Sequence, residues 1–195
     1  MYMLTLSALI RSRQMMKKHL TPSFVAIEQG QPGAGKGKAL SAVDSALEGL
    51  EENTWVHLTY HGKQDPMQPY NSHFIMRDEH LMLLDIMDRG IPHAEFTFLS
   101  ACHTAVGDEE TPDEAIHLAA GLQFSGFKSV VDMLWEVDDA VAKHVVEAFY
   151  TYMFHPKEVG VMDPMKAAWA LNCATHTLKT KVPLEQRMVF IHIGV

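Results

Sequence analysis

The chain has 195 residues, of which 47% are hydrophobic and 21% are charged. This length and composition suit one globular domain with a full core. The formal net charge is −8, and the 16 lysines and arginines are too few for the clustered basic surface that nucleic-acid binding requires. Two cysteines, Cys102 and Cys173, cannot build a disulfide framework, and free thiols favour a reducing compartment such as the cytoplasm.

The chain opens with ten mostly apolar residues, followed by basic ones. A signal peptide has the opposite order, and no apolar run approaches the roughly 20 residues that span a bilayer. We therefore predict no targeting segment and no membrane segment. Residues 4–20 predict an opening helix, and residues 24–27 predict a short buried strand.

A glycine-rich turn at residues 30–37 follows this strand and precedes a helix predicted for residues 39–50. Its sequence, GQPGAGKG, fits the pattern of a phosphate-binding loop and resembles that of adenylate kinases. Such a loop needs a hydroxyl beside its lysine to help hold Mg²⁺, but no Ser or Thr follows Lys36 until Ser41. We favour a glycine-rich helix start and keep a P-loop nucleotide-binding protein as the third candidate.

Two hydrophobic runs end in residues that can carry chemistry. Residues 55–60 lead into His61 and Gly62, and residues 96–99 lead toward Cys102. Because the carboxyl ends of neighbouring strands meet at one edge of an open α/β sheet, we expect His61 and Cys102 to lie close together. In a cysteine hydrolase, the thiolate attacks a carbonyl carbon and the imidazole moves the proton. The backbone N–H groups of Gly62 and Cys102 are the predicted oxyanion hole.

A metal site is the alternative interpretation of the histidines. His57 and His61 share a face of the predicted strand, but four residues of strand separate their rings by about 13 Å, which is too far to share a zinc ion. We therefore expect no metal and no other cofactor. Several further histidines are predicted in loops or at element ends and are interpreted as surface residues: His73, His80, His93 and His155.

A lone cysteine is usually a small buried hydrophobe, and this is the alternative for Cys102. A small and polar stretch follows Cys102, however, whereas Cys173 is predicted in the middle of a helix. Only Cys102 is therefore placed for exposure. Its thiolate needs assistance, because an ordinary thiol has a pKa of about 8.5.

Strands and helices alternate along the rest of the chain, which predicts an α/β fold with a mostly parallel sheet flanked by helices. The segment 62–73 is predicted to be a loop. The predicted elements that follow are a hairpin of 74–76 and 81–83, a helix near 85–89 ended by Pro92, a helix from a capping box at Thr111 to about Gly126, a strand at 128–134, a helix capped by Asp138 or Asp139, a helix from 163 to about 180, and a strand at 189–193.

Four ordered segments carry a family resemblance: 57–62 (HLTYHG), 98–105 (FLSACHTA), 113–127 (DEAIHLAAGLQFSGF) and 130–139 (VVDMLWEVDD). Together they resemble a CHAT domain, a caspase-like cysteine peptidase module related to separase. The resemblance implies a single domain over residues 1–195 with a caspase-like α/β sandwich fold. It also implies a His61–Cys102 dyad that hydrolyses peptide bonds in protein or peptide substrates. Similar members carry a glycine segment without a nucleotide role.

The resemblance implies a regulatory partner as well, because CHAT domains often accompany tetratricopeptide repeats, which this chain lacks. Two departures stand out. An aromatic residue, Tyr60, precedes the His-Gly pair where small residues are common. The chain is also expected to be shortened on its N-terminal side, with a strand-containing stretch missing near residues 42–48, which would expose a sheet edge.

Acidic residues follow the third long strand and predict a pocket for a basic substrate side chain: Asp132, Glu136, Asp138 and Asp139. A helix cap is the alternative role for Asp138 or Asp139. The leading functional hypothesis is a caspase-like cysteine endopeptidase, a hydrolase. The alternative is a catalytically inactive interaction module of the same fold, in which the dyad is misaligned or the shortened sheet blocks the substrate.

Overall fold

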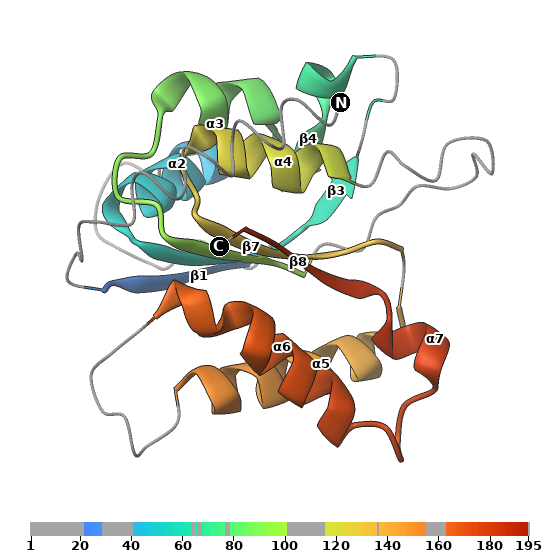
Figure 1. Ribbon diagram of the computed structural model, residues 1–195. Coiled ribbons are helices and arrows are strands. Elements are labelled where there is room, and N and C mark those ends of the chain that lie inside the picture. Colours follow the sequence, from blue (N-terminus) through green and yellow to red (C-terminus); the bar gives the residue numbers. More distant parts are fainter. Residues whose placement is uncertain are drawn as a thin grey trace.

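A five-stranded sheet forms the middle layer of the fold, and helices cover both of its faces (Figure 1). The computed structural model describes residues 22–28, 41–63, 65, 68–76, 79–100, 116–135, 137–154 and 163–194. The strand order is β1-β2-β6-β7-β8; the first four strands are parallel, and β8 is antiparallel to β7. This arrangement confirms the predicted fold class and is compatible with a caspase-like sandwich. The strands are β1 (Phe24–Glu28), β2 (Trp55–Thr59), β6 (Phe96–Leu99), β7 (Ser129–Met133) and β8 (Phe190–Gly194).

The central strands are buried on both faces, as expected for parallel strands between two helical layers. Alternate side chains enter two separate cores. Leu58, Leu99 and Val130 face one core, whereas Trp55 and Phe98 face the other. The first core is covered by α2 (Ala42–Glu52), α3 (Leu83–Arg89) and α4 (Ile116–Ser125), and the second by α5 (Asp139–Met153) and α6 (Ala167–Thr177) (Figure 1).

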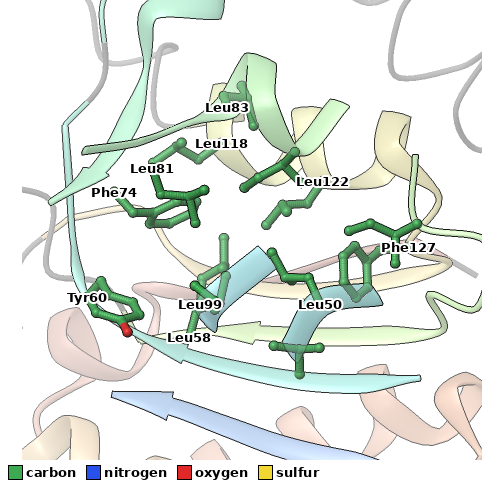
Figure 2. Packing of buried hydrophobic residues seen from close by; sticks show 14 of the residues in the cluster. Leu50, Leu58, Tyr60, Phe74, Leu81, Leu83, Leu99, Leu118, Leu122 and Phe127 are labelled. Carbon is green, nitrogen blue, oxygen red and sulfur yellow. The ribbon is translucent and has the colours of Figure 1, made fainter. Parts of the chain in front are cut away.

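A small antiparallel sheet extends the first core. It consists of β3 (His61–Lys63), β4 (His73–Ile75) and β5 (His80–Met82). Phe74 and Leu81 project from it into the core that Figure 2 shows, above Leu58 and Leu99 of the main sheet. The predicted hairpin is confirmed. The predicted loop at residues 62–73 is wrong at its start, because Gly62 and Lys63 belong to β3. The strand β3 contains a glycine and, with three residues, is too short to show an alternating pattern.

The helix boundaries follow local capping. Ser41 caps α2, since its Oγ accepts a hydrogen bond from the Asp44 amide, so the helix begins at Ala42, later than predicted. The helix α3 ends at Arg89 as predicted, and it is capped by Gly90, whose φ of 58° favours glycine, before the chain reaches Pro92. Asp138 caps α5 as predicted.

The C-terminal elements complete the second helical layer. The 3₁₀ turn Pro164–Lys166 leads into α6, which ends at Thr177, three residues before the predicted end. The short helix α7 (Leu184–Arg187) then precedes β8. Earlier in the chain, between the strands of the small sheet, a separate 3₁₀ turn, Pro69–Asn71, precedes β4. No helix among the described residues is both long and apolar enough to cross a bilayer.

Several predictions lie outside the described residues. These are the opening helix at 4–20, the glycine turn at 30–37, the helix start at Thr111, and the residues Cys102, Glu136 and His155. The strand β1 pairs only with β2 in the described part and is an edge strand of the main sheet. The predicted strand at residues 24–27 is therefore present, but the prediction that it is buried is wrong, because Phe24 and Ala26 are exposed at this edge.

Candidate active site

The strands that lead to His61 and Cys102 are direct neighbours in the main sheet. β2 and β6 are parallel, and their register places Leu58 opposite Leu99. The Ser100 amide continues this pairing by donating a hydrogen bond to the Leu58 carbonyl over 3.0 Å. Both strands therefore end at the same edge of the sheet, as predicted. Cys102 lies three residues beyond Leu99 and outside the described residues.

His61 lies just beyond the end of β2 but belongs to a different strand. β2 ends at Thr59, the buried Tyr60 follows, and His61 then pairs with Ile75 in the small sheet. The prediction of one strand running from residue 55 into His61 is therefore wrong at its end. The side chain of His61 is exposed, and Gly62 is buried opposite Phe74.

The Tyr60 ring belongs to the first hydrophobic core, where Figure 2 shows it with Leu58 and Phe74. Its burial anchors the chain where it passes from the main sheet to the small one. The aromatic residue that departs from the family pattern thus contributes to the packing beneath this junction.

A partly buried hydrogen-bonded network joins the ends of β2 and β6. His57 Nε2 lies 2.7 Å from Ser100 Oγ, and His57 Nδ1 lies 3.0 Å from the hydroxyl of Tyr150 on α5. Ser100 Oγ also donates a hydrogen bond to Thr59 Oγ1 over 3.3 Å. The His57 ring stacks on Phe98, with ring centroids 5.0 Å apart. This network connects three elements at the carboxyl edge of the sheet.

A neutral imidazole with its proton on Nε2 fits this network. Because Ser100 donates its proton to Thr59, it accepts one from His57 Nε2, and in a neutral ring Nδ1 then accepts from the Tyr150 hydroxyl. Burial lowers the pKa of His57 from 6.5 to about 4, which favours the same neutral form. Burial also raises the pKa of Tyr150, so the phenol keeps the proton that it donates.

Sequence reasoning missed this network. It considered His57 only as a metal ligand. The signal was the occurrence of a polar residue inside the apolar run of β2, since a buried imidazole requires hydrogen-bond partners. Ser100, at the end of the neighbouring strand, was the nearest candidate in the predicted sheet. Tyr150 was not foreseeable, because its contact depends on the packing of α5.

The predicted acidic pocket residues lie on different parts of the fold. Asp132 is buried in β7, where its Oδ1 accepts a hydrogen bond from the Met133 amide. Its place in the strand puts it on the same face as Val130, toward α2–α4. Asp138 caps α5 on the opposite face, where its carboxylate accepts from the Ala140 amide. The helix cap that was the alternative for Asp138 is thus observed, and the substrate pocket stays a prediction.

The other predicted histidines and the second cysteine are also placed by the structure. His73 and His80 are the first residues of β4 and β5 and thus lie at element ends as predicted, and their rings stack with centroids 4.3 Å apart. Cys173 lies in α6 as predicted, but it is partly exposed and not buried. Among the described residues, no three His, Cys, Asp or Glu side chains form a group that could hold a metal ion.

A comparison with protein families decides the classification. A model of the CHAT domain matches residues 7–183. The chain belongs to the CHAT domain family. The match includes both predicted dyad segments, the hairpin of β4 and β5, and the sheet as far as β7. No curated protein matches the chain in a sequence search. For this CHAT domain, the family suggests a caspase-like, peptidase-related protein.

Proposed function

We propose that this CHAT domain is a caspase-like cysteine endopeptidase, with Cys102 as the nucleophile and His61 as the acid–base partner. The observation that carries the proposal is the parallel pairing of β2 with β6, because it brings the starting points of both segments to one sheet edge. The exposed side chain of His61 at this edge is accessible to a substrate. A protein or peptide substrate would bind across the same edge.

The proposed reaction has two stages. The Cys102 thiolate attacks the scissile carbonyl carbon, a C–S bond forms, and the carbonyl oxygen takes the electron pair. The backbone N–H groups of Gly62 and Cys102 bind this oxyanion, and His61 gives a proton to the leaving amine as the C–N bond breaks. Water then attacks the acyl-enzyme while His61 accepts its proton, and the acid product leaves as the thiolate is regenerated.

The setting of the reaction follows from the same features. A free, partly exposed thiol at Cys173 fits the reducing cytoplasm that the cysteine count favours. A tetratricopeptide-repeat region is the proposed regulatory partner, since it often accompanies this family. The proposal requires no metal and no cofactor, because thiolate chemistry needs only the dyad and hydrogen-bond donors.

Labelling with a peptidyl acyloxymethyl ketone tests the nucleophile. We expect one adduct on Cys102 in the wild type and in the matched control Cys173→Ala, and none in Cys102→Ala. A substrate-library digest compared between wild type and Cys102→Ala then gives the cleavage preference. Equal labelling of wild type and Cys102→Ala would overturn the nucleophile assignment. A folded wild type that neither labels nor cleaves would favour the inactive interaction module.

A further inference from the structure

Three hydrogen bonds fasten Ser100 to β2. Its amide donates to the Leu58 carbonyl, its Oγ accepts from His57 Nε2, and the same Oγ donates to Thr59 Oγ1. Ser100 stands two residues before Cys102, and His57 stands four residues before His61. The same contacts therefore join the two segments that lead to the proposed dyad.

The His57 ring is itself held from two sides. One face stacks on Phe98, which in turn packs edge-on against Phe149, with centroids 5.2 Å apart. The Tyr150 hydroxyl is hydrogen-bonded to Nδ1 over 3.0 Å and thereby fixes the orientation of the imidazole. A ring fixed in this way directs its Nε2–H at Ser100.

We propose that Tyr150, His57 and Ser100 act as positioning residues that hold the exits of β2 and β6 in the register that the Cys102–His61 dyad needs. This inference rests on the proposed function. It assigns roles to three residues outside the dyad, each acting through the chain segments that it fixes. An error of about 1 Å in the placement of a reacting group can cost a hundredfold in rate. A small displacement of Ser100 would therefore lower the reaction rate of the Cys102–His61 dyad strongly.

The Ser100–His57 distance also matches that of a nucleophile and its base, but the network argues against this role. With Ser100 donating to Thr59 and Tyr150 donating to Nδ1, His57 presents a proton and not a lone pair to Ser100. The low pKa of the imidazole, about 4, makes it a weak proton acceptor as well. His57 is therefore suited to hold Ser100 rather than to activate it.

Tyrosine-to-phenylalanine variants of α5 test the positioning role. Tyr150→Phe removes the hydroxyl that is hydrogen-bonded to His57 Nδ1. The matched control is Tyr152→Phe, which removes another hydroxyl of α5, one that is hydrogen-bonded to Thr177 Oγ1 of α6 over 2.8 Å. The measurement is the labelling of Cys102 in the full chain by the peptidyl acyloxymethyl ketone, resolved into kinact and KI. We expect kinact to fall about tenfold or more in Tyr150→Phe with KI unchanged, and to stay within about twofold in Tyr152→Phe.

A second pair of variants keeps the test decisive if Tyr150→Phe does not fold. Ser100→Ala should lose labelling rate, and Ser100→Thr should restore most of it because the hydroxyl is kept. Equal kinact for wild type and folded Tyr150→Phe, or equal losses in Ser100→Ala and Ser100→Thr, would overturn the positioning role while leaving the dyad intact. A wild type in which Cys102 does not label would instead overturn the proposed function, and this inference with it.

Discussion

Two serine–histidine hydrogen bonds lie on the same face of the main sheet, at opposite ends of its strands. Ser100 and His57 are 2.7 Å apart at the carboxyl end of β6, and Ser129 and His192 are 2.8 Å apart at the amino end of β7. Burial lowers the pKa of both imidazoles. The chemistry of the two pairs is therefore nearly the same.

Their surroundings differ. The Ser100 pair continues into Tyr150 and Thr59 and borders the segments that lead to the proposed dyad. The Ser129 pair follows directly after Lys128, whose ammonium forms a buried ion pair with Glu95 over 3.2 Å. Ligands bind at the carboxyl ends of parallel strands. The Ser100–His57 pair is therefore a candidate for a functional role, whereas the Ser129–His192 pair at the amino end is a structural element.

The largest expected effect is on stability at the amino end. Lys128→Ala leaves the Glu95 carboxylate buried without its charge partner, and we expect this change to cost about 3–5 kcal/mol of unfolding free energy. Urea denaturation measures the loss. The double variant Glu95→Gln/Lys128→Met should recover much of it, and the Cys102 labelling rate per folded molecule should stay at the wild-type level. A large fall in that rate would show that the amino end also serves the site.

Acid should destabilise the protein through His57. The folded pKa is about 4 and the ordinary value is 6.5, so the unfolded state binds more protons between these values. The contribution of the neutral imidazole to the unfolding free energy is complete above about pH 6.5 and is lost as the pH falls toward 4. The loss is about 2–3 kcal/mol at pH 4.5.

Urea unfolding at pH 7.5 and pH 4.5 measures this loss. We expect His57→Gln to remove more of the acid-induced loss than His192→Gln, because burial depresses the pKa of His57 strongly. If His57→Gln and the wild type lose equal stability in acid, the imidazole is not held neutral as described.

The serine variants compare the two pairs directly. We expect Ser100→Ala to lower the rate of Cys102 labelling about tenfold, equivalent to about 1.4 kcal/mol of activation free energy. Ser129→Ala should leave this rate within about twofold and alter only the melting temperature. Equal effects of the two substitutions on labelling would remove the functional distinction between the pairs.

The smallest expected effect concerns the cap of α5, the helix that carries Tyr150. Asp138→Ala should cost about 1 kcal/mol of unfolding free energy, because the Ala140 amide loses its acceptor. Probes with arginine or a neutral residue before the electrophile should keep their relative labelling rates. A selective loss for the arginine probe would instead place Asp138 in the predicted substrate pocket.

Much of the fold followed from the sequence, because apolar runs and capping residues are local signals. The strand of residues 24–27, the hairpin of β4 and β5 and the helix after Asp138 were all predicted. The adjacency of β2 and β6 also followed, since both runs are apolar and end in polar or small residues. These features depend on patterns that a few neighbouring residues define.

The rest of the site depends on contacts between distant residues. The strand that contains His61, β3, pairs with the predicted hairpin, whose Phe74 and Leu81 complete the first core, and no local pattern shows this pairing. The link between His57 and Tyr150 spans 93 positions of the chain and requires α5 to lie across the sheet. Tertiary packing of this kind is where sequence patterns lose their predictive value.

The central claim is that the carboxyl ends of β2 and β6 bring the Cys102 sulfur and the His61 imidazole together. Iodoacetamide alkylation at pH 6, followed site by site by mass spectrometry, tests it most directly. We expect Cys102 to react much faster than Cys173 in the wild type, and His61→Ala to remove this advantage because the thiolate loses its partner. Equal rates for the two cysteines in the wild type, or an unchanged Cys102 rate in folded His61→Ala, would contradict it.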